Sequence, residues 1–220
     1  SDVDDGLGPT SIVIVGVPAH GAVVLHADGT VTYTHDGSES IADSFTYTVR
    51  DASGAVSNLA TVTLTVRAVN DAPVLLAAPV VMGTTIEDAG LPAGPAGSLV
   101  SSLVGSSGSA ANVSDQDAGA ALGIAITAAA ADNGTWWYSI DDGASWDTLG
   151  DLSEQSARLL AADASTRLYF QPNPDWNGTL SSALLFRAWD QSSGSNAGLA
   201  DVSVAGGASA FSVGAASASL

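Results

Sequence analysis

The chain of 220 residues contains 23 Asp and Glu residues against 5 Lys and Arg residues, which gives a formal net charge of -18 at pH 7. Because contacts with phosphate need basic side chains, this charge argues against nucleic acid as a partner. The chain has no cysteine, so neither disulfide bonds nor thiolate metal sites can stabilise it. No stretch is long and apolar enough to span a membrane, so we expect no membrane insertion.

The composition favours strands over helices. The chain has 24 Gly and 8 Pro, and only 13% of its residues are charged. This suits short strands joined by turns better than amphipathic helices, and no long segment shows the 3.6-residue period of a helix. We therefore expect an all-β fold.

The acidic residues are unusually rich in aspartate. Only Glu39, Glu87 and Glu154 are Glu, so the other 20 acids are Asp. Aspartate is the short carboxylate that sits in turns and also reaches a metal bound at strand ends. Two interpretations stay open at this point: the acids bind a hard cation, or they form a solvated acidic surface with no defined site.

The first half of the chain reads as a series of short strands. From Ile12 a β-branched run is followed by a break at Pro18 and then by two strands around residues 27–29, Ala-Asp-Gly, which predicts a hairpin. In residues 45–50 and 59–66 apolar and polar residues alternate, as in strands with one buried and one wet face. Several short strands with turns at this spacing predict a β-sandwich.

A domain boundary is expected where the strand pattern stops. After Val66 the alternation ends, and Pro73 forces extended backbone on the residue before it. We therefore predict one domain in residues 1–72 and a second in residues 73–220. Residues 74–111 are rich in Ala, Gly, Pro and Ser, which predicts a long flexible excursion with short strands at either side.

The second half resembles an enlarged copy of the first. Residues 133–149 give a strand, an Asp-Gly turn and a strand, and residues 211–220 read as a last strand. Residues 184–194, LLFRAWDQSSG, repeat the order of residues 45–54, FTYTVRDASG: an alternating strand, an Asp and a Ser/Gly turn. We interpret the halves as diverged copies of one sandwich, the second lengthened by insertions.

Residues 139–146, SIDDGASW, fit the pattern called an Asp box, a hairpin turn known from sialidases and other β proteins. In those proteins the Asp fixes the turn and the Trp packs beneath it, so we expect a structural role for Asp141 and Trp146. No pattern of nucleophile and base accompanies it, and we expect no enzymatic activity.

All 5 Trp residues lie in the second half. Trp136 and Trp137 are adjacent on a predicted strand, so they point to opposite faces and at most one belongs to the core. Trp residues that are exposed could stack on sugar rings, which leaves a carbohydrate-binding face as an alternative to core packing.

Two segments of the first half resemble a known family. Residues 43–74, DSFTYTVRDASGAVSNLATVTLTVRAVNDAPV, resemble the last two strands and the linker of cadherin-like repeats in large bacterial surface adhesins of the RTX type, secreted by the type I route. Residues 18–39 match the same repeat. The second half looks like a longer repeat that occurs in tandem with such modules. The resemblance implies two tandem cadherin/immunoglobulin-like β-sandwich domains, the second larger.

The resemblance also implies calcium as a cofactor. In cadherin-like arrays calcium binds between successive domains through a D-x-D pair, an Asp at the end of the penultimate strand and an N-D-x-P linker. Carried over to this chain, the ligands are Asn70, Asp71, Glu87, Asp115, Asp117 and Asp190.

A second, incomplete ligand set consists of Asp2, Asp4 and Asp51, whose upstream linker is missing from this chain. Two positions depart from the family pattern, because Ala68 stands where the first linker acid is expected and Ala72 where the second Asn is expected. The junction therefore has fewer ligands than the pattern, and the number of calcium ions stays open.

The chemistry of these residues supports calcium independently. Calcium takes about 6–8 oxygen ligands, and a D-x-D pair in extended backbone points both carboxylates to one face. For the acids of the first domain two roles stay open: Asp36 and Glu39 either complete a calcium site or make a turn, whereas for Asp43 we favour a turn that caps backbone amides.

We expect the chain to be a calcium-binding extender of an extracellular adhesin on the bacterial surface, with a role in cell adhesion and biofilm. Its partners would be the neighbouring repeats of the same polypeptide. The alternative is a module that binds a cell-surface glycan or protein through exposed aromatics of the second domain.

Overall fold

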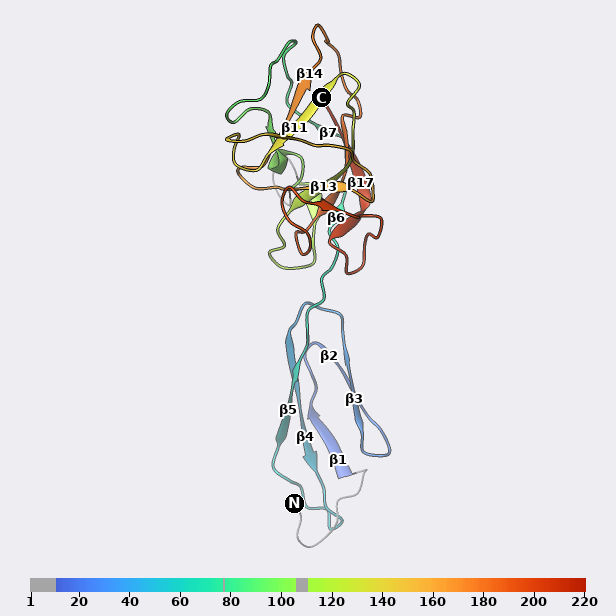
Figure 1. Cartoon of the computed structure of the whole chain (residues 1–220). Helices are drawn as coiled ribbons and strands as arrows, with labels where there is room; N and C mark the ends of the chain where they lie inside the picture. Colours follow the sequence, from blue (N-terminus) through green and yellow to red (C-terminus); the bar gives the residue numbers. More distant parts are fainter. Residues whose placement is uncertain (1–10, 77, 106–110) are drawn as a thin grey trace. The chain divides into compact units, whose positions relative to one another are not determined.

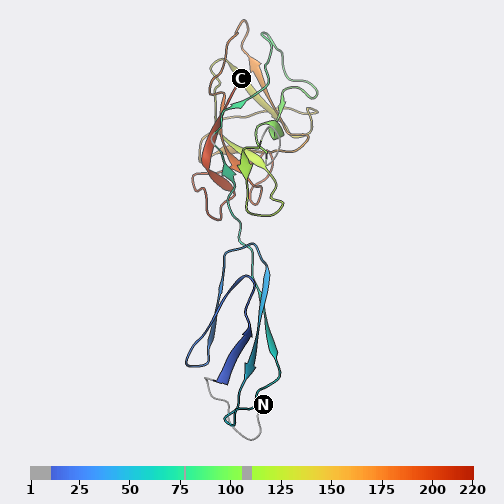
Figure 2. The same ribbon diagram turned by 180° about the vertical axis from the view of Figure 1, so that it is seen from behind.

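The computed structural model describes residues 11–76, 78–105 and 111–220. The chain divides into two compact units, Ser1–Val69 and Asn70–Leu220, each described by itself below (Figure 1; Figure 2 shows the same ribbon from behind). Both units are built from β-strands, as predicted. Within the described ranges, no helix has the length and apolarity that crossing a membrane requires. That residues 1–72 and 73–220 form two separate domains stays a prediction.

The first unit consists of a three-stranded antiparallel sheet, in the order β1-β4-β5, and a two-stranded hairpin, β2-β3. Its strands are β1 (Ile12–Gly16), β2 (Gly21–Leu25), β3 (Val31–His35), β4 (Ala42–Val49) and β5 (Ala60–Thr65). The predicted hairpin is confirmed. Gly29 takes a positive φ of 84°, and Oδ1 of Asp28 accepts the N–H of Thr30 at 3.0 Å, which closes the turn.

The core of the first unit is thin. Phe45 is buried, whereas alternate side chains of β1, β2, β3 and β5 are only half-buried. A buried carboxylate adds to this core. Asp43 accepts the N–H groups of Ala19 and His20, both at 2.9 Å, and the hydroxyl of Tyr33 at 3.0 Å. The predicted amide-capping role of Asp43 is therefore confirmed.

The second unit contains a six-stranded sheet, β16-β13-β10-β15-β17-β7, a four-stranded sheet, β12-β11-β14-β8, and a small pair, β6-β9. The elements are β6 (Val74–Leu75), β7 (Val80–Val81), β8 (Ser98–Leu99), the 3-10 helix η2 (Val100–Ser102), β9 (Val113–Ser114), β10 (Gly123–Ala129), β11 (Gly134–Ser139), β12 (Asp147–Thr148), β13 (Ala157–Ala161), β14 (Arg167–Pro172), β15 (Leu184–Trp189), β16 (Leu199–Ala200) and β17 (Phe211–Ser219).

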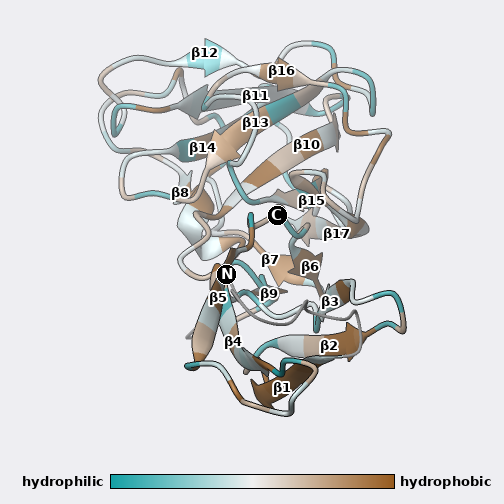
Figure 3. Cartoon of the chain, turned by 90° about the horizontal axis from the view of Figure 1, so that it is seen from below, coloured by the Kyte–Doolittle hydropathy of each residue, from teal (hydrophilic) through white to brown (hydrophobic). Residues whose placement is uncertain are grey.

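Two apolar clusters hold the second unit together. The larger lies between the six- and four-stranded sheets and includes Ile124, Phe170 and Phe186. The smaller lies around Trp189 and Leu159. Because β10 contributes Ile124 to one cluster and its neighbour Ala125 to the other, both faces of this central strand are buried, and Figure 3 shows its apolar stretch in brown.

Part of the predicted flexible excursion belongs to the core, so that prediction is wrong for residues 98–105. Val100, Leu103 and Val104 are 0%, 1% and 1% exposed. The N–H of Val100 also donates to the carbonyl of Thr166 at 2.9 Å. The composition did not predict this burial, because Gly and Ser residues outnumber the few apolar residues in this part of the sequence.

The adjacent tryptophans separate as predicted. Trp136 is 3% exposed and packs in the larger core, 5.0 Å from the ring of Phe170, whereas Trp137 is partly exposed. The turn role of Asp141 is confirmed as well. Its carboxylate accepts the hydroxyls of Ser139 and Ser145 and the N–H of Ser145, and the Ser145 hydroxyl is the leading cause of a pKa lowered to about 2.

Candidate metal centre

The start of the second unit is fastened to the end of strand β15. The side-chain amide of Asn70 donates to Oδ2 of Asp190 at 2.8 Å and to the carbonyl of Ser209 at 3.2 Å. Asp190 directly follows β15 and is only 5% exposed. Because the side-chain nitrogen of Asn70 makes these bonds, its side-chain oxygen is left to accept a hydrogen bond or to bind a metal ion.

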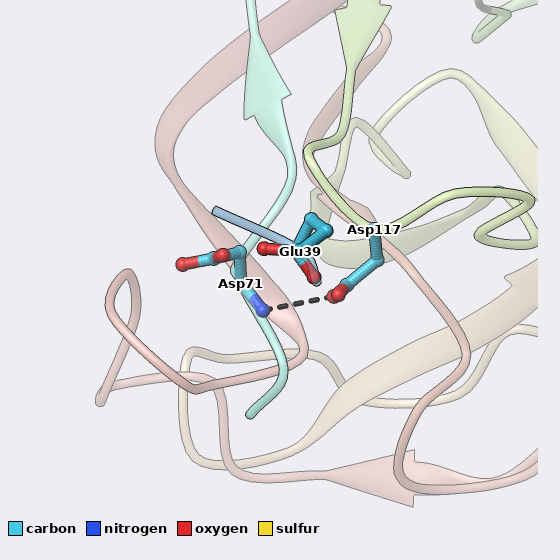
Figure 4. Close-up of side chains that lie close together, drawn as sticks. All are labelled: Glu39, Asp71 and Asp117. Carbon is cyan, nitrogen blue, oxygen red and sulfur yellow. Dashed lines mark hydrogen bonds between the residues drawn. The ribbon is translucent and has the colours of Figure 1, made fainter. Parts of the chain in front are cut away.

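The predicted D-x-D pair meets the same segment. The backbone N–H of Asp71 donates to Oδ2 of Asp117 at 2.9 Å, the bond drawn in Figure 4. In turn, the N–H of Asp117 donates to Oδ1 of Asp115 at 2.9 Å. Carboxylate oxygens of Asp71 and Asp117 lie within 4.8 Å of each other. Glu39, also drawn in Figure 4, belongs to the first unit and is exposed.

Asp115 has a buried carboxylate oxygen, Oδ2, without a hydrogen-bond donor among the described residues. Burial raises the pKa of Asp115, and the negative charges of Asp117, Asp190 and Asp71 raise it further. A buried carboxylate oxygen without a donor costs free energy, and a cation would supply the missing partner. The oxygen-only donor set fits calcium.

A cavity of about 470 Å³ adjoins these acids. Asp71 and Asp115 line it together with β6, Ser114 and the Gly206-Gly207 turn. The cavity gives a bound ion room for water ligands, which calcium commonly keeps when the protein provides fewer than its usual number of oxygens.

The structure does not bring Glu87 to this cluster. Glu87 lines a pocket with Leu220, beyond the end of β17, whereas Asp190 follows β15. These two strands are antiparallel, with Trp189 opposite Phe211 and Leu184 opposite Ala218, so Glu87 and Asp190 lie at opposite ends of the pair. Glu87 lies instead with Asp88 and Asp175, one oxygen of each within 4.8 Å of the others.

The second predicted ligand set stays a prediction. Asp2 and Asp4 lie outside the described residues. Asp51 is described, and its Oδ1 accepts the hydroxyl of Ser53 and the N–H of Ala55, both at 2.7 Å. These bonds lower the pKa of Asp51 and give the carboxylate a local role in the β4–β5 turn.

Much of the aspartate content serves turns of this kind. Each of these carboxylates accepts a backbone N–H two or more positions ahead: Asp28, Asp36, Asp51, Asp141, Asp163 and Asp201. These six of the chain's 20 Asp residues therefore have a turn role that does not require a metal. For Asp36 the turn interpretation is supported, because Oδ1 accepts the N–H of Ser38 at 2.9 Å.

Two backbone carbonyl groups beside the candidate metal centre were not predicted from the sequence. The carbonyl of Ser209 accepts the amide of Asn70, and the carbonyl of Gly207 accepts the N–H of Ala72 at 2.8 Å. Backbone acceptors have no side-chain signature. The one available signal is the Gly206-Gly207 pair, where both residues take positive φ.

The comparisons with known proteins bear on the first unit. Residues 1–68 match the model of a family described as bacterial cadherin-like domain. Such domains are generally extracellular structural or adhesion modules of the cell surface. Neither the curated proteins nor the solved structures gave a match to the chain.

Proposed function

We propose that the chain is a calcium-binding extender module of a bacterial cell-surface adhesin. The observation that carries the proposal is Asp115, whose buried Oδ2 has no hydrogen-bond partner among the described residues, while burial and the charges of neighbouring carboxylates raise its pKa. Asp71, Asp117 and Asp190 provide further oxygens, and Asn70 adds a neutral amide oxygen. Such an all-oxygen set suits a hard divalent cation.

Calcium would act on the segment that joins the two units. Asn70 is the first residue of the second unit, and its side chain and the N–H of Asp71 already bind the acids of that unit. Without metal these acids repel one another, and a bound cation neutralises them. Fixing Asn70 and Asp71 in this way restricts the hinge that immediately precedes them.

The proposal extends to the cellular context. A stiffened array of such modules projects a distal binding domain away from the cell. The chain would then lie outside the cell, next to neighbouring repeats of one polypeptide, in an adhesin of the RTX type with a role in biofilm. This role involves no catalysis.

A thermal melt tests the proposal. The full chain is unfolded in EDTA, in 10 mM calcium and in 10 mM magnesium at equal ionic strength. For a dissociation constant of about 0.1 mM, within the range of extracellular modules, calcium adds about 2.7 kcal/mol, or roughly 5–10 °C in Tm for a chain of this size. Equal Tm values in calcium and EDTA would reject the proposal.

A matched pair of variants assigns the effect to the cluster. Asp115→Asn removes one predicted ligand with little change of shape, and Asp132→Asn makes the same charge change at an exposed loop residue. We expect the first variant to lose about half or more of the calcium-dependent rise in Tm and the second to keep it.

A further inference from the structure

A groove of about 440 Å³ lies on the outer side of the four-stranded sheet. One wall is the loop Leu91–Gly94, and the other is formed by Trp137 of β11 and by the Asp-box residues Gly143–Trp146. None of the predicted calcium ligands lines it. The groove is therefore independent of the proposed calcium site.

Both walls of the groove are held in place. The hydroxyl of Tyr169 on β14 donates to the carbonyl of Gly90 at 2.9 Å, which ties the loop to the sheet. Gly143 packs directly against the carbonyl of Gly94, so closely that no side chain could fit there. Figure 1 shows this loop in green beside β11 and β14. A groove with fixed walls loses little entropy when a ligand enters.

Its aromatic side chains are not needed by either core. The clusters that hold the unit together contain Trp136 and Trp189, whereas Trp137 and Trp146 belong to neither and stay partly exposed. The ring of Trp146 meets Tyr169 edge to face with centroids 6.0 Å apart. The indole N–H of Trp137 donates to Oε1 of Gln171 at 3.2 Å, which fixes the orientation of that ring. Indole surface of this kind is suited to stacking.

The charges around the groove select the class of ligand. No residue that lines it is charged. The neighbouring ion pair between Nε of Arg167 and Oδ1 of Asp142, 2.5 Å apart, carries no net charge. The carboxylate of Asp141 lies behind Ser145, whose hydroxyl and N–H it accepts. This carboxylate and the net charge of -18 oppose an anion, and the uncharged lining favours a neutral ligand.

We propose that this groove binds a neutral glycan, with the flat C–H face of a sugar ring stacked on the exposed indole surface of Trp137 and Trp146. Sugars present an apolar face and a rim of hydroxyls. The open groove offers the stacking surface in its walls and leaves the hydroxyls in contact with water and with the polar side chains around it, such as Gln171 and Ser145. Proline-rich peptides also dock on aromatic-lined grooves, so such a peptide is a comparator in the test.

The test uses the full chain on an array of neutral oligosaccharides built from glucose, galactose, mannose and N-acetylhexosamines, with sialylated and sulfated glycans and a proline-rich peptide as comparators. We expect retention of a neutral glycan, and we expect it to persist in EDTA because no calcium ligand lines the groove. Failure of the calcium proposal would leave this result unchanged.

Two variants and a control locate the binding. Trp137→Ala removes the stacking surface and should weaken binding at least tenfold. Ala144→Glu fills the groove from an exposed position and should abolish binding with an unchanged Tm. Leu185→Ala, on the exposed face of the other sheet, should bind as the original chain does. The proposal is overturned if no neutral glycan is retained at millimolar concentration, if Ala144→Glu binds normally, or if only anionic glycans or the peptide are retained.

Discussion

The side-chain amide of Asn70 donates a hydrogen bond of 2.8 Å to Oδ2 of Asp190, although 120 positions separate the two residues in the sequence. Asp190 also accepts the N–H of Ser192 at 2.7 Å on its other oxygen. One buried carboxylate thus joins the first residue of the second unit to the turn that follows β15. This contact uses protein groups alone, and it holds the side chain of Asn70 beside the carboxylate of Asp190.

Replacing Asn70 by Ala should destabilise the second unit. The change removes a neutral donor from a buried carboxylate, and hydrogen bonds to charged groups are worth about 1.5–3 kcal/mol. We expect a loss of that size in the free energy of unfolding in EDTA, measured by urea titration with Trp fluorescence. Asn177→Ala, at an exposed residue, serves as the control and should change little. Equal stability of the two variants would contradict the role of Asn70.

Asp115→Asn should have opposite effects without and with calcium. Without calcium it removes a negative charge that lies near other carboxylates and whose buried Oδ2 has no hydrogen-bond partner among the described residues, so Tm in EDTA should rise. With calcium it removes a ligand, and the dissociation constant should increase at least tenfold. Calorimetry and thermal melts of the same sample check both signs. A variant that is less stable in EDTA and still binds calcium normally would refute the account of Asp115.

The stability of the first unit should fall in acid because of Asp43. Burial by itself would raise the pKa of Asp43, but the N–H groups of Ala19, His20 and Ser44 and the hydroxyl of Tyr33 lower it from 3.8 to about 2. An acid whose pKa is lowered by folding stabilises fully above its unfolded pKa and loses this contribution as pH falls through the folded value. The window therefore runs from about pH 4 down to about pH 2.

The amide NMR signals of Ala19 and His20 report this transition. In Asp43→Asn the unit should be less stable at pH 7, and the decline between pH 4 and pH 2 should be smaller than in the original chain. Tyr33→Phe, which removes one of the donors and keeps the carboxylate, should retain the decline. An unchanged pH profile in Asp43→Asn would contradict this assignment.

Gly143→Ala should be much more damaging than Gly150→Ala. Both glycines have positive φ, 89° and 75°, so each substitution carries a backbone cost of about 1–3 kcal/mol. Only at Gly143 would the added Cβ overlap the carbonyl of Gly94, whereas at Gly150 the nearest atom is 3.9 Å away. Denaturant titration of the two variants gives the difference. Equal destabilisation would mean that the contact between the Asp box and the loop is not tight.

The sequence was most informative where local chemistry decides the structure. The hairpin at Asp28-Gly29, the opposite faces of Trp136 and Trp137, and the turn built by Asp141 all depend on neighbouring residues. A turn residue or an alternating strand acts within a few positions, so its pattern is legible in the chain itself.

Long-range placement was harder to predict. Val100 and Leu103 enter the core from a segment whose composition predicts a long flexible excursion. Glu87 follows the linker closely in sequence, yet it lies at the end of the β15–β17 pair opposite Asp190, because the intervening chain runs along the unit through β6 and β7. Which end of a sandwich a loop residue reaches depends on strand order, and strand order is set by the whole core.

An NMR titration of the full chain with calcium chloride, followed by the same titration with magnesium chloride, tests the central claim most directly. The account predicts saturable, calcium-specific shifts at the amides of Asn70, Asp71, Asp115, Asp117 and Asp190, with smaller shifts at turn acids such as Asp141 and Asp201. Shifts of equal size at all exposed acids, and the same with magnesium, would mean that the cluster is only part of an acidic surface and would contradict the account.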